Sequence, residues 1–290
     1  MVHWRILLYQ NNYQKKVIKK KKRRLNKKGK LLLIIIFSLI LFIILPKHKE
    51  NKQQEEQKTV KVQNEIEEKV VPNITFSSND LREGEEIVGK TKNGYLITKL
   101  NDIYYIDGVL IVNKTYPLPA TFKPTNPYKE ITKDYLYGAD YIEDYVMEAF
   151  LKMSSDAEKE NIKIRITSGY RSYSVQKDLY NNYVKRDGKE VADAYSARAG
   201  YSEHQSGLAF DLNGTNRNFI KTKEGKWLND NCYKYGFVLR YPDGKTQYTG
   251  YIYEGWHFRY VGIELATKLY NNGDWLSMEE YYGITSEYND

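Results

Sequence analysis

The sequence predicts an α+β fold in which a small antiparallel sheet is flanked by helices. Stretches with strand character and stretches with helical periodicity are mixed along the chain, without the strand-helix-strand regularity of a parallel sheet. The chain has 290 residues, of which 41% are hydrophobic. This length and composition suffice for one medium-sized domain with a real core, together with appended segments.

The first predicted elements are short strands. Residues 94–97 and 104–112 are rich in Ile, Leu, Val and Tyr, and Asp107-Gly108 within the second stretch is typical of a tight turn. Four prolines follow between residues 115 and 127. Because proline fixes the backbone and lacks an N–H donor, this stretch is predicted to be an extended connection that wraps around the domain.

The pattern changes to helical after Ala139. Apolar residues recur at steps of three and four from Ile142 to Met153, which predicts an amphipathic helix with one face on a core. Residues 163–168 alternate as a strand does, and a second helix is predicted to begin with Ser172 or Ser174 as its N-cap and to continue to about Lys185. The remaining predicted elements are strands at 208–212, 237–241 and 256–260 and helices at 263–270 and 277–282.

The positive charge of the chain is concentrated at its start. The formal net charge is +8, but residues 1–30 carry twelve of the 45 Lys and Arg residues and no acids. The remainder therefore has 33 basic against 37 acidic residues. The basic character belongs to the leader, so the composition gives no support for nucleic-acid binding by the folded part.

An apolar stretch follows this leader. Residues 31–45 are interrupted only by Ser38, and a helix of this length would cover about 22 Å of a hydrocarbon core about 30 Å thick. The preceding positive charge predicts a cytoplasmic N-terminus and an extracytoplasmic body. A cleaved signal peptide is the alternative, although no small-residue cleavage site follows Leu45. The predicted division is a basic cytoplasmic leader (1–30), a transmembrane anchor (31–46), a polar linker (47–73), a small β-containing segment (74–115) and a main domain (116–290).

Cysteine chemistry contributes little to the function. Cys232 is the one cysteine of the chain, so no intrachain disulfide can form. It lies in an amphipathic run with Trp227, Leu228 and Tyr235, and we expect it to be a small buried hydrophobe.

Two histidines are the candidate metal ligands of the folded part. The chain has four, and His3 and His48 lie in or beside the charged leader, which leaves His204 and His257 in the folded part. Either one alone could be an ordinary half-buried residue. Both, however, have carboxylates close in sequence, and two imidazoles with one carboxylate form a common ligand set for a catalytic zinc that keeps its fourth position open for water.

The neighbouring carboxylates fit this ligand set. Asp211 is predicted on a strand that the chain enters through Gly207, and a carboxylate in such apolar surroundings is costly unless a cation compensates it. Glu254 precedes His257 by three residues, so it could act as the base while His257 binds the metal. Gly255 and its aromatic neighbours predict a loop that enters a strand, unlike the helical H-E-x-x-H motif. These residues predict a zinc hydrolase.

Three motifs together resemble a known family. They are Ser202-x-His-x-x-Gly-x-Ala-x-Asp211, Glu254-x-Trp-His257 and Gly169-Tyr-Arg-Ser172. They are similar to those of the VanY-type D-alanyl-D-alanine carboxypeptidases of bacterial peptidoglycan metabolism, whose zinc peptidase fold is shared with hedgehog signalling domains. The resemblance covers roughly residues 105–285, and the leader and linker lie outside it.

The resemblance assigns roles to particular residues. It implies that one zinc ion is bound by His204, Asp211 and His257, and that Glu254 is the general base. It also implies that the terminal carboxylate or the polarised carbonyl of the substrate is held by Arg171, Gln176 and Ser202. Arg171 suits an exopeptidase, because a guanidinium can grip a carboxylate with two hydrogen bonds. From spacing alone, Gln176 could equally be an exposed helix residue and Ser202 an ordinary loop residue.

The implied activity is zinc-dependent removal of the terminal D-alanine from peptidoglycan stem peptides. With the predicted anchor, this describes a single-pass protein of the bacterial cell membrane with an extracytoplasmic catalytic domain, and we expect a monomer. An L,D-carboxypeptidase acting on tetrapeptide stems remains an open alternative. A second alternative is a non-catalytic zinc-containing wall-binding module, which would be expected to lack the base, whereas Glu254 is present.

One stretch of the sequence matches a motif of serine peptidases. Ser174-Val-Gln-Lys177 matches the S-x-x-K motif of penicillin-binding D,D-peptidases. The S-D-N and K-T-G motifs that accompany it in those enzymes do not follow in this sequence. Ser174 is therefore better interpreted as a helix-capping residue.

Overall fold

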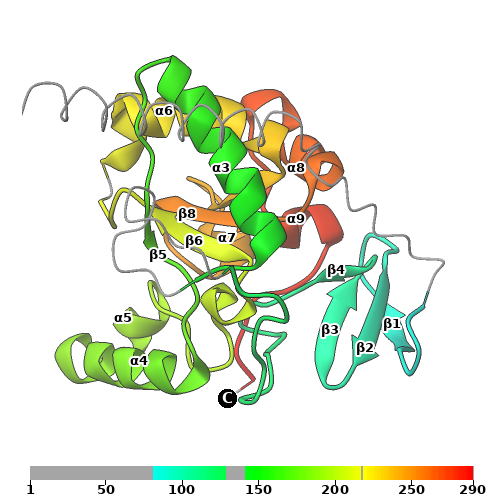
Figure 1. The fold of residues 1–290 in the computed structure, drawn as a ribbon. Coiled ribbons are helices and arrows are strands. Elements are labelled where there is room, and N and C mark those ends of the chain that lie inside the picture. The colour runs from blue at the N-terminus through cyan, green and yellow to red at the C-terminus, as the bar shows by residue number, and fades with distance from the viewer. Residues whose placement is uncertain (1–80, 129–140, 217, 290) are drawn as a thin grey trace, which may run out of the picture. The chain divides into compact units, whose positions relative to one another are not determined.

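The computed structural model of the protein describes residues 81–128, 141–216 and 218–289. The predicted leader (1–30), anchor (31–46) and linker (47–73) lie outside these residues. In the described part of the chain, no helix is both long enough and apolar enough to cross a membrane. The fold is α+β, as the sequence predicts, but it has two small antiparallel sheets with helices around them, where one sheet was predicted (Figure 1).

The first sheet is a simple meander in the order β1-β2-β3-β4. Asp107 and Gly108, between β3 and β4, both have positive φ (50° and 76°), which a tight hairpin turn of this kind requires. The predicted turn is thus confirmed. The strands are β1 (Glu86–Lys90), β2 (Leu96–Leu100), β3 (Ile103–Ile106) and β4 (Val109–Leu110).

This first sheet is fixed to the C-terminal helix α9 (Met278–Tyr282). The side chain of Asn93, just before β2, donates a hydrogen bond to the carbonyl oxygen of Tyr281 (2.9 Å). The Tyr95 ring lies 5.5 Å from the Tyr281 ring and 5.1 Å edge-on from the Tyr282 ring. Aromatic pairs at these distances bury large apolar areas, so the sheet is packed on the rest of the domain.

The second sheet carries the candidate site and has the order β5-β6-β8-β7, with every neighbouring pair antiparallel. Its strands are β5 (Ile166–Ser168), β6 (Ala209–Leu212), β7 (Phe237–Tyr241) and β8 (Glu254–Tyr260). All four strands were predicted. Three bounds differ. Strand β5 is confined to the last three residues of the predicted 163–168 strand, and β6 begins one residue later than the predicted 208–212 strand. Strand β8 already begins at Glu254, where a loop was predicted.

Helix α3 (Asp144–Lys159) covers one face of this sheet (Figure 1). It begins five residues later than Ala139, where the helical pattern was predicted to start. Its Phe150 ring packs edge-on against Phe210 of β6 at 5.5 Å. The predicted apolar face is confirmed, since Val146, Phe150 and Met153 are fully buried.

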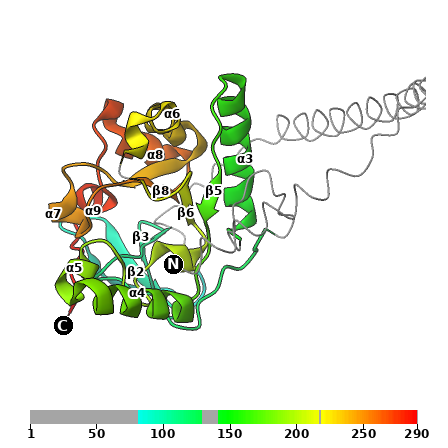
Figure 2. The ribbon, with the colours of Figure 1, turned by 90° about the vertical axis from the view of Figure 1, so that its left-hand side faces the viewer.

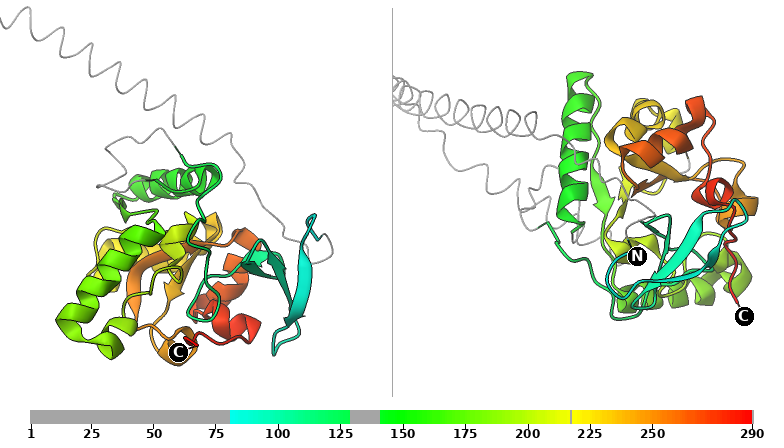
Figure 3. Two further views of the ribbon diagram at one scale, coloured as in Figure 1. Left: turned by 90° about the horizontal axis from the view of Figure 1, so that it is seen from below. Right: turned by 90° about the vertical axis from the view of Figure 1, so that its right-hand side faces the viewer.

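Helices α4 (Tyr173–Asp187) and α5 (Lys189–Asp193) follow β5 and lie together, away from α3 (Figures 2 and 3). Ser172 caps α4, because its hydroxyl accepts a hydrogen bond from the backbone N–H of Val175 (3.3 Å). Of the two predicted caps, the structure therefore uses Ser172 rather than Ser174.

The C-terminal half adds further helices around the second sheet. Helices α8 (Ile263–Tyr270) and α9 agree with the prediction, whereas α6 (Lys223–Asn231) and α7 (Thr246–Thr249) were not predicted. Cys232 follows α6 and is fully buried, and this burial raises the pKa of its thiol. Cys232 is thus a core residue, as predicted.

The proline-rich connection at 115–127 contains no helix or strand, as predicted. It is tied to the domain through its backbone. The Glu143 carboxylate accepts hydrogen bonds from the N–H groups of Thr125 (2.7 Å) and Asn126 (2.9 Å), and Leu118 N–H donates to the carbonyl of Gly200 (2.7 Å). The segment also contacts the turn that carries His204, because the side chain of Gln205 donates a hydrogen bond to the carbonyl oxygen of Pro119 (2.8 Å).

Candidate active site

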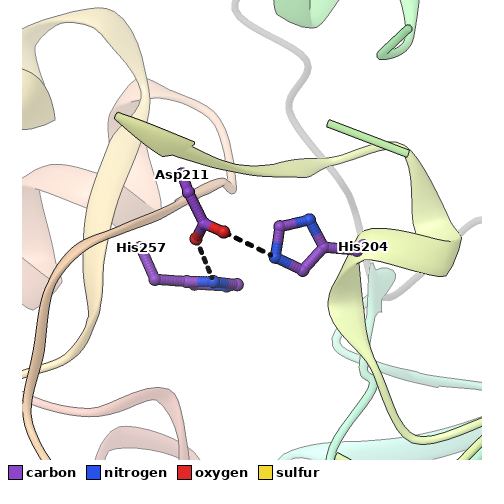
Figure 4. Close-up of side chains that lie close together, drawn as sticks. All are labelled: His204, Asp211 and His257. Atoms are coloured by element: carbon purple, nitrogen blue, oxygen red, sulfur yellow. Dashed lines mark hydrogen bonds and ion pairs between the residues drawn. The ribbon is translucent and has the colours of Figure 1, made fainter. Parts of the chain in front are cut away.

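Three buried residues meet at the surface of the second sheet (Figure 4). His204 lies in a short 3-10 helix (Glu203–Ser206), Asp211 on β6, and His257 directly opposite Asp211 on β8. One Asp211 oxygen is 3.5 Å from His204 Nε2, and the other is 3.2 Å from His257 Nδ1. One ligand atom of each residue lies within 4.8 Å of the others, so these three atoms could surround a single ion.

Gly207 makes the connection between His204 and Asp211 possible. Its φ of 72° is in the left-handed region that favours glycine. A Cβ at this position would lie 2.7 Å from Cγ of Pro124, closer than two non-bonded carbon atoms in proteins approach. The sharp turn into β6, predicted from this glycine, is therefore confirmed, and it places His204 beside the strand that carries Asp211.

The backbone fixes the orientation of His204. Its Nδ1 is 2.7 Å from the carbonyl oxygen of Gly169, which can only accept, so Nδ1 carries the hydrogen and Nε2 presents its lone pair toward Asp211. Burial lowers the pKa of His204, and the nearby charge of Arg171 lowers it further. A neutral imidazole with a fixed tautomer is the form that binds a metal.

Asp211 and His257 form a strongly polarised pair. Burial would raise the pKa of Asp211, but His204 and His257 hold it well below its usual range. Burial would likewise lower the pKa of His257, but hydrogen bonds to Asp211 and Glu203 outweigh it and raise the pKa to about 9. Positive charge is thus favoured between these side chains, and a metal cation can supply it in place of a proton.

This donor set fits zinc. Two imidazole nitrogens and a carboxylate oxygen are the three protein ligands of many catalytic zinc sites, which leave a fourth position for water or substrate. All three side chains are at most 8% exposed, so the ligands are shielded while the adjoining cavity remains accessible.

Glu254 lies at the edge of the same group. One of its carboxylate oxygens is 4.0 Å from His257 Nδ1, and its side chain is 14% exposed. In a regular strand, residues three apart point to opposite faces. Here Tyr241 pairs with Glu254 and Leu239 with Phe258, so β8 has extra residues opposite Arg240. This bulge brings Glu254 and His257 to the same side.

The predicted substrate-binding residues line the same cavity, whose volume is about 260 Å³. Arg171 donates hydrogen bonds to the side-chain oxygen of Gln176 (2.8 Å) and to the hydroxyl of Ser168 (3.0 Å). Gln176 is 1% exposed and donates to the carbonyl oxygen of Ala197 (2.6 Å). Gln176 is therefore a buried support for Arg171, and not an exposed helix residue. Ser202 is also buried at the cavity wall.

The structure thus brings all the predicted site residues together around one cavity. Two other residues of the site, Tyr241 and Glu203, were not predicted. Tyr241 lines the cavity with its ring centre 4.9 Å from that of His257, and buried Glu203 contacts His257 on the other side. A signal for Glu203 was available, since Arg240 and Arg259 each lie beside apolar residues on predicted strands and require partners if they are buried.

The sequence of the chain is similar to those of known carboxypeptidases. The profile of the VanY family, described as D-alanyl-D-alanine carboxypeptidase, matches residues 139–263. The chain is 38% identical over 201 residues to the Bacillus subtilis protein YodJ, covering 63% of this chain and 73% of YodJ. It is 34% identical over 190 residues to a D-alanyl-D-alanine carboxypeptidase of Enterococcus faecium, covering 63% of this chain and 60% of that enzyme.

Solved structures of bacterial peptidases are also similar to this structure. The L,D-carboxypeptidase DacB of Streptococcus pneumoniae is 37% identical with a TM-score of 0.53, and the match covers 67% of this chain and 98% of DacB. A mutant of the vancomycin resistance D,D-pentapeptidase VanY, in complex with Zn(II), is 32% identical with a TM-score of 0.50. That match covers 59% of this chain and 96% of the other.

The fold and the buried His-Asp-His group define a zinc metallocarboxypeptidase, with one zinc ion as cofactor. The chain belongs to the VanY family of D-alanyl-D-alanine carboxypeptidases. The resemblance drawn from the three sequence motifs is thereby confirmed.

Proposed function

We propose that the protein removes the terminal D-alanine from peptidoglycan stem peptides that end in D-Ala-D-Ala. The observation that carries this proposal is one cavity that joins a carboxylate-binding arginine, Arg171, to the His-Asp-His group and Glu254. An exopeptidase needs this combination, because it must hold a free carboxylate at a fixed distance from the bond that it cleaves.

The proposed zinc ligands are Nε2 of His204, the carboxylate of Asp211 and Nδ1 of His257. These atoms face one another, while the outward nitrogens of the two rings contact Gly169 and Glu203. When bound, zinc lowers the pKa of a water molecule from about 15.7 to about 7 and polarises the scissile carbonyl.

Glu254 is the proposed general base. Its carboxylate accepts a proton from the attacking water and delivers that proton to the nitrogen of the leaving D-alanine. Two features support this role: its oxygen lies 4.0 Å from His257 Nδ1, and its side chain lines the cavity. Proton transfer of this kind contributes roughly 10²- to 10⁴-fold to the rate.

Arg171 is the proposed anchor for the substrate carboxylate. A guanidinium has five N–H donors, more than the two contacts with Gln176 and Ser168 use. These two contacts hold the guanidinium plane in place, so that it can bind a carboxylate with little loss of side-chain freedom. Ser202, on the same cavity wall, is proposed to hydrogen-bond the same end of the substrate.

A second candidate is cleavage of tetrapeptide stems by L,D-carboxypeptidase activity. It is favoured by the likeness to DacB, which is described as an L,D-carboxypeptidase and is 37% identical, compared with 32% for the D,D-pentapeptidase VanY. Both reactions release one C-terminal D-alanine, so the same zinc group, base and arginine would serve either.

Peptide products distinguish these candidates. The purified zinc-loaded protein is incubated separately with a stem pentapeptide ending in D-Ala-D-Ala and with the matching tetrapeptide, and the products are identified by mass spectrometry. Loss of one alanine from the pentapeptide alone supports the first candidate, and loss from the tetrapeptide alone supports the second. Cleavage of neither peptide would contradict both and would favour a wall-binding module.

We also propose that residues 31–46 anchor the protein in the cell membrane as a single span and that the catalytic domain, 116–290, works as a monomer outside the cytoplasm. The apolar run after a basic leader supports this topology. An alkaline phosphatase fusion at residue 60 tests it, because the phosphatase is active only outside the cytoplasm. An inactive fusion that is produced at normal levels would refute the outside placement.

A further inference from the structure

Glu203, the residue before His204, lies at the centre of a buried cluster of charges. Its side chain is 1% exposed. One carboxylate oxygen, Oε1, accepts hydrogen bonds from Nε of Arg240 (2.8 Å) and Nη1 of Arg259 (3.1 Å). The other oxygen, Oε2, lies 3.3 Å from Nε2 of His257. The two oxygens therefore have different partners, guanidinium groups on one side and an imidazole on the other.

The cluster extends away from the cavity. Arg240 also donates two hydrogen bonds to Glu279, to Oε2 (2.8 Å) and to Oε1 (2.6 Å), and Asn113 donates to the same carboxylate (3.0 Å). Arg259 donates to the carbonyl oxygen of Leu110 (2.8 Å). Two carboxylates and two guanidinium groups thus balance in formal charge, and they join both sheets and helix α9 to the site.

A gain in stability does not by itself explain a buried cluster of this kind. Removing charges from water costs several kcal/mol per ion, and buried ion pairs can often be replaced by apolar residues without loss of stability. A carboxylate that is hydrogen-bonded to a metal-binding histidine can have a role other than stability, because it fixes the tautomer and the ring orientation of that histidine. Only Glu203 in this cluster contacts His257.

We propose that Glu203 is a positioning residue that holds His257 with its hydrogen on Nε2, so that Nδ1 is presented to the zinc ion. The inference rests on the proposed function, because it takes His257 as a zinc ligand. Each ligand histidine then has one nitrogen held by an acceptor, the Gly169 carbonyl for His204 and the Glu203 carboxylate for His257. The two arginines hold the carboxylate in place through hydrogen bonds to its other oxygen.

The chain offers a closely matched control for this role. Glu279, like Glu203, is a glutamate with a 1% exposed side chain, belongs to the same cluster and is bonded to Arg240. The substitutions Glu203→Gln and Glu279→Gln each remove one buried negative charge from Arg240. They differ in that only the first changes the partner of His257.

The test measures the zinc dissociation constant of the full chain by competition with a chromogenic chelator. The measurement is made at a temperature at which circular dichroism shows each protein to be folded. We expect Glu203→Gln to weaken zinc binding about 10- to 100-fold, the range typical for loss of such a partner, and Glu279→Gln to change it much less. Equal zinc affinity in Glu203→Gln and wild type, or equal weakening in both variants, would overturn the inference.

A second measurement requires no variant and decides the question if Glu203→Gln does not fold. Nitrogen-15 NMR of the histidine side chains in the zinc-loaded wild type is expected to show His257 with its hydrogen on Nε2. A hydrogen on Nδ1 would overturn the inference. The proposed ligand set has its own test, which is separate from the role of Glu203. That ligand set would be wrong if His257→Ala bound zinc as tightly as the wild type.

Discussion

The side-chain oxygen of Gln176 lies 2.8 Å from Nη1 of Arg171, and the amide of Gln176 donates in turn to the carbonyl of Ala197. Helix α4 therefore positions the arginine through a buried glutamine. Without Gln176, the guanidinium would keep its contact with Ser168 but lose one of the two partners that orient it.

We expect Gln176→Ala to lower kcat/KM for the stem peptide by roughly 10- to 100-fold, mainly through KM, because a misplaced binding group costs about this much. The zinc content should stay at one ion, since Gln176 contacts none of the three ligands. Lys177→Ala, at the exposed neighbouring position of α4, is the matched control. A wild-type kcat/KM in Gln176→Ala would show that Arg171 needs no such support.

Much of the fold could be predicted from the sequence because its signals are local. Strand β7 and helix α8 have the predicted bounds, since apolar periodicity and flanking glycines define them within a few residues. The short helices α5 and α7 have only five and four residues, too few to show a helical period. The early start of β8 depends on its pairing with β7, which no local pattern contains.

The zinc group was predictable for a similar reason. His204 and Asp211 are joined by one tight turn, and Glu254 and His257 lie on one strand, so each pair is a short motif. Glu203 and Tyr241 belong to the site through contacts between segments far apart in the sequence. The contact of Tyr241 depends on the pairing of β7 with β8, and that of Glu203 on the position of its turn beside β8. No local sequence pattern contains either relationship.

Gly255 lies inside the bulge of β8, between the base and the third ligand. A Cβ at this position would lie 2.2 Å from the hydroxyl oxygen of Tyr253. We therefore expect Gly255→Ala to displace the tyrosine, to destabilise the protein by about 1–3 kcal/mol, and to lower kcat/KM by disturbing Glu254 and His257. Urea unfolding and peptide kinetics measure the two effects.

A double-mutant cycle checks the cause of this loss. In the Tyr253→Ala background the clashing ring is absent, so Gly255→Ala should cost much less stability there than in the wild type. If the cost is the same in both backgrounds, contact with Tyr253 is not the reason for the glycine.

Glu85 makes the stability of the first sheet sensitive to acid. Hydrogen bonds from Arg82 and Thr98 outweigh burial and lower the pKa of Glu85 from 4.5 to about 2. The folded state therefore favours the ionised form. This stabilisation is complete above about pH 4.5 and is lost as the pH falls toward 2.

The difference in unfolding free energy between the wild type and Glu85→Gln should follow the same course. We expect it to be largest above pH 4.5 and to shrink between pH 4.5 and 2, as measured by urea unfolding at a series of pH values. A difference that is independent of pH would contradict the assigned pKa shift.

The most direct test of the zinc carboxypeptidase account is the rate of D-alanine release in three samples: the metal-stripped protein, the same protein reloaded with one zinc ion, and zinc-loaded Glu254→Gln. We predict that D-alanine is released only after zinc is restored. At equal zinc content, the rate in Glu254→Gln should be about 10²- to 10⁴-fold lower than in the wild type. Equal rates with and without zinc would contradict the role of the His204, Asp211 and His257 group, and an undiminished rate in Glu254→Gln would contradict the role of the base.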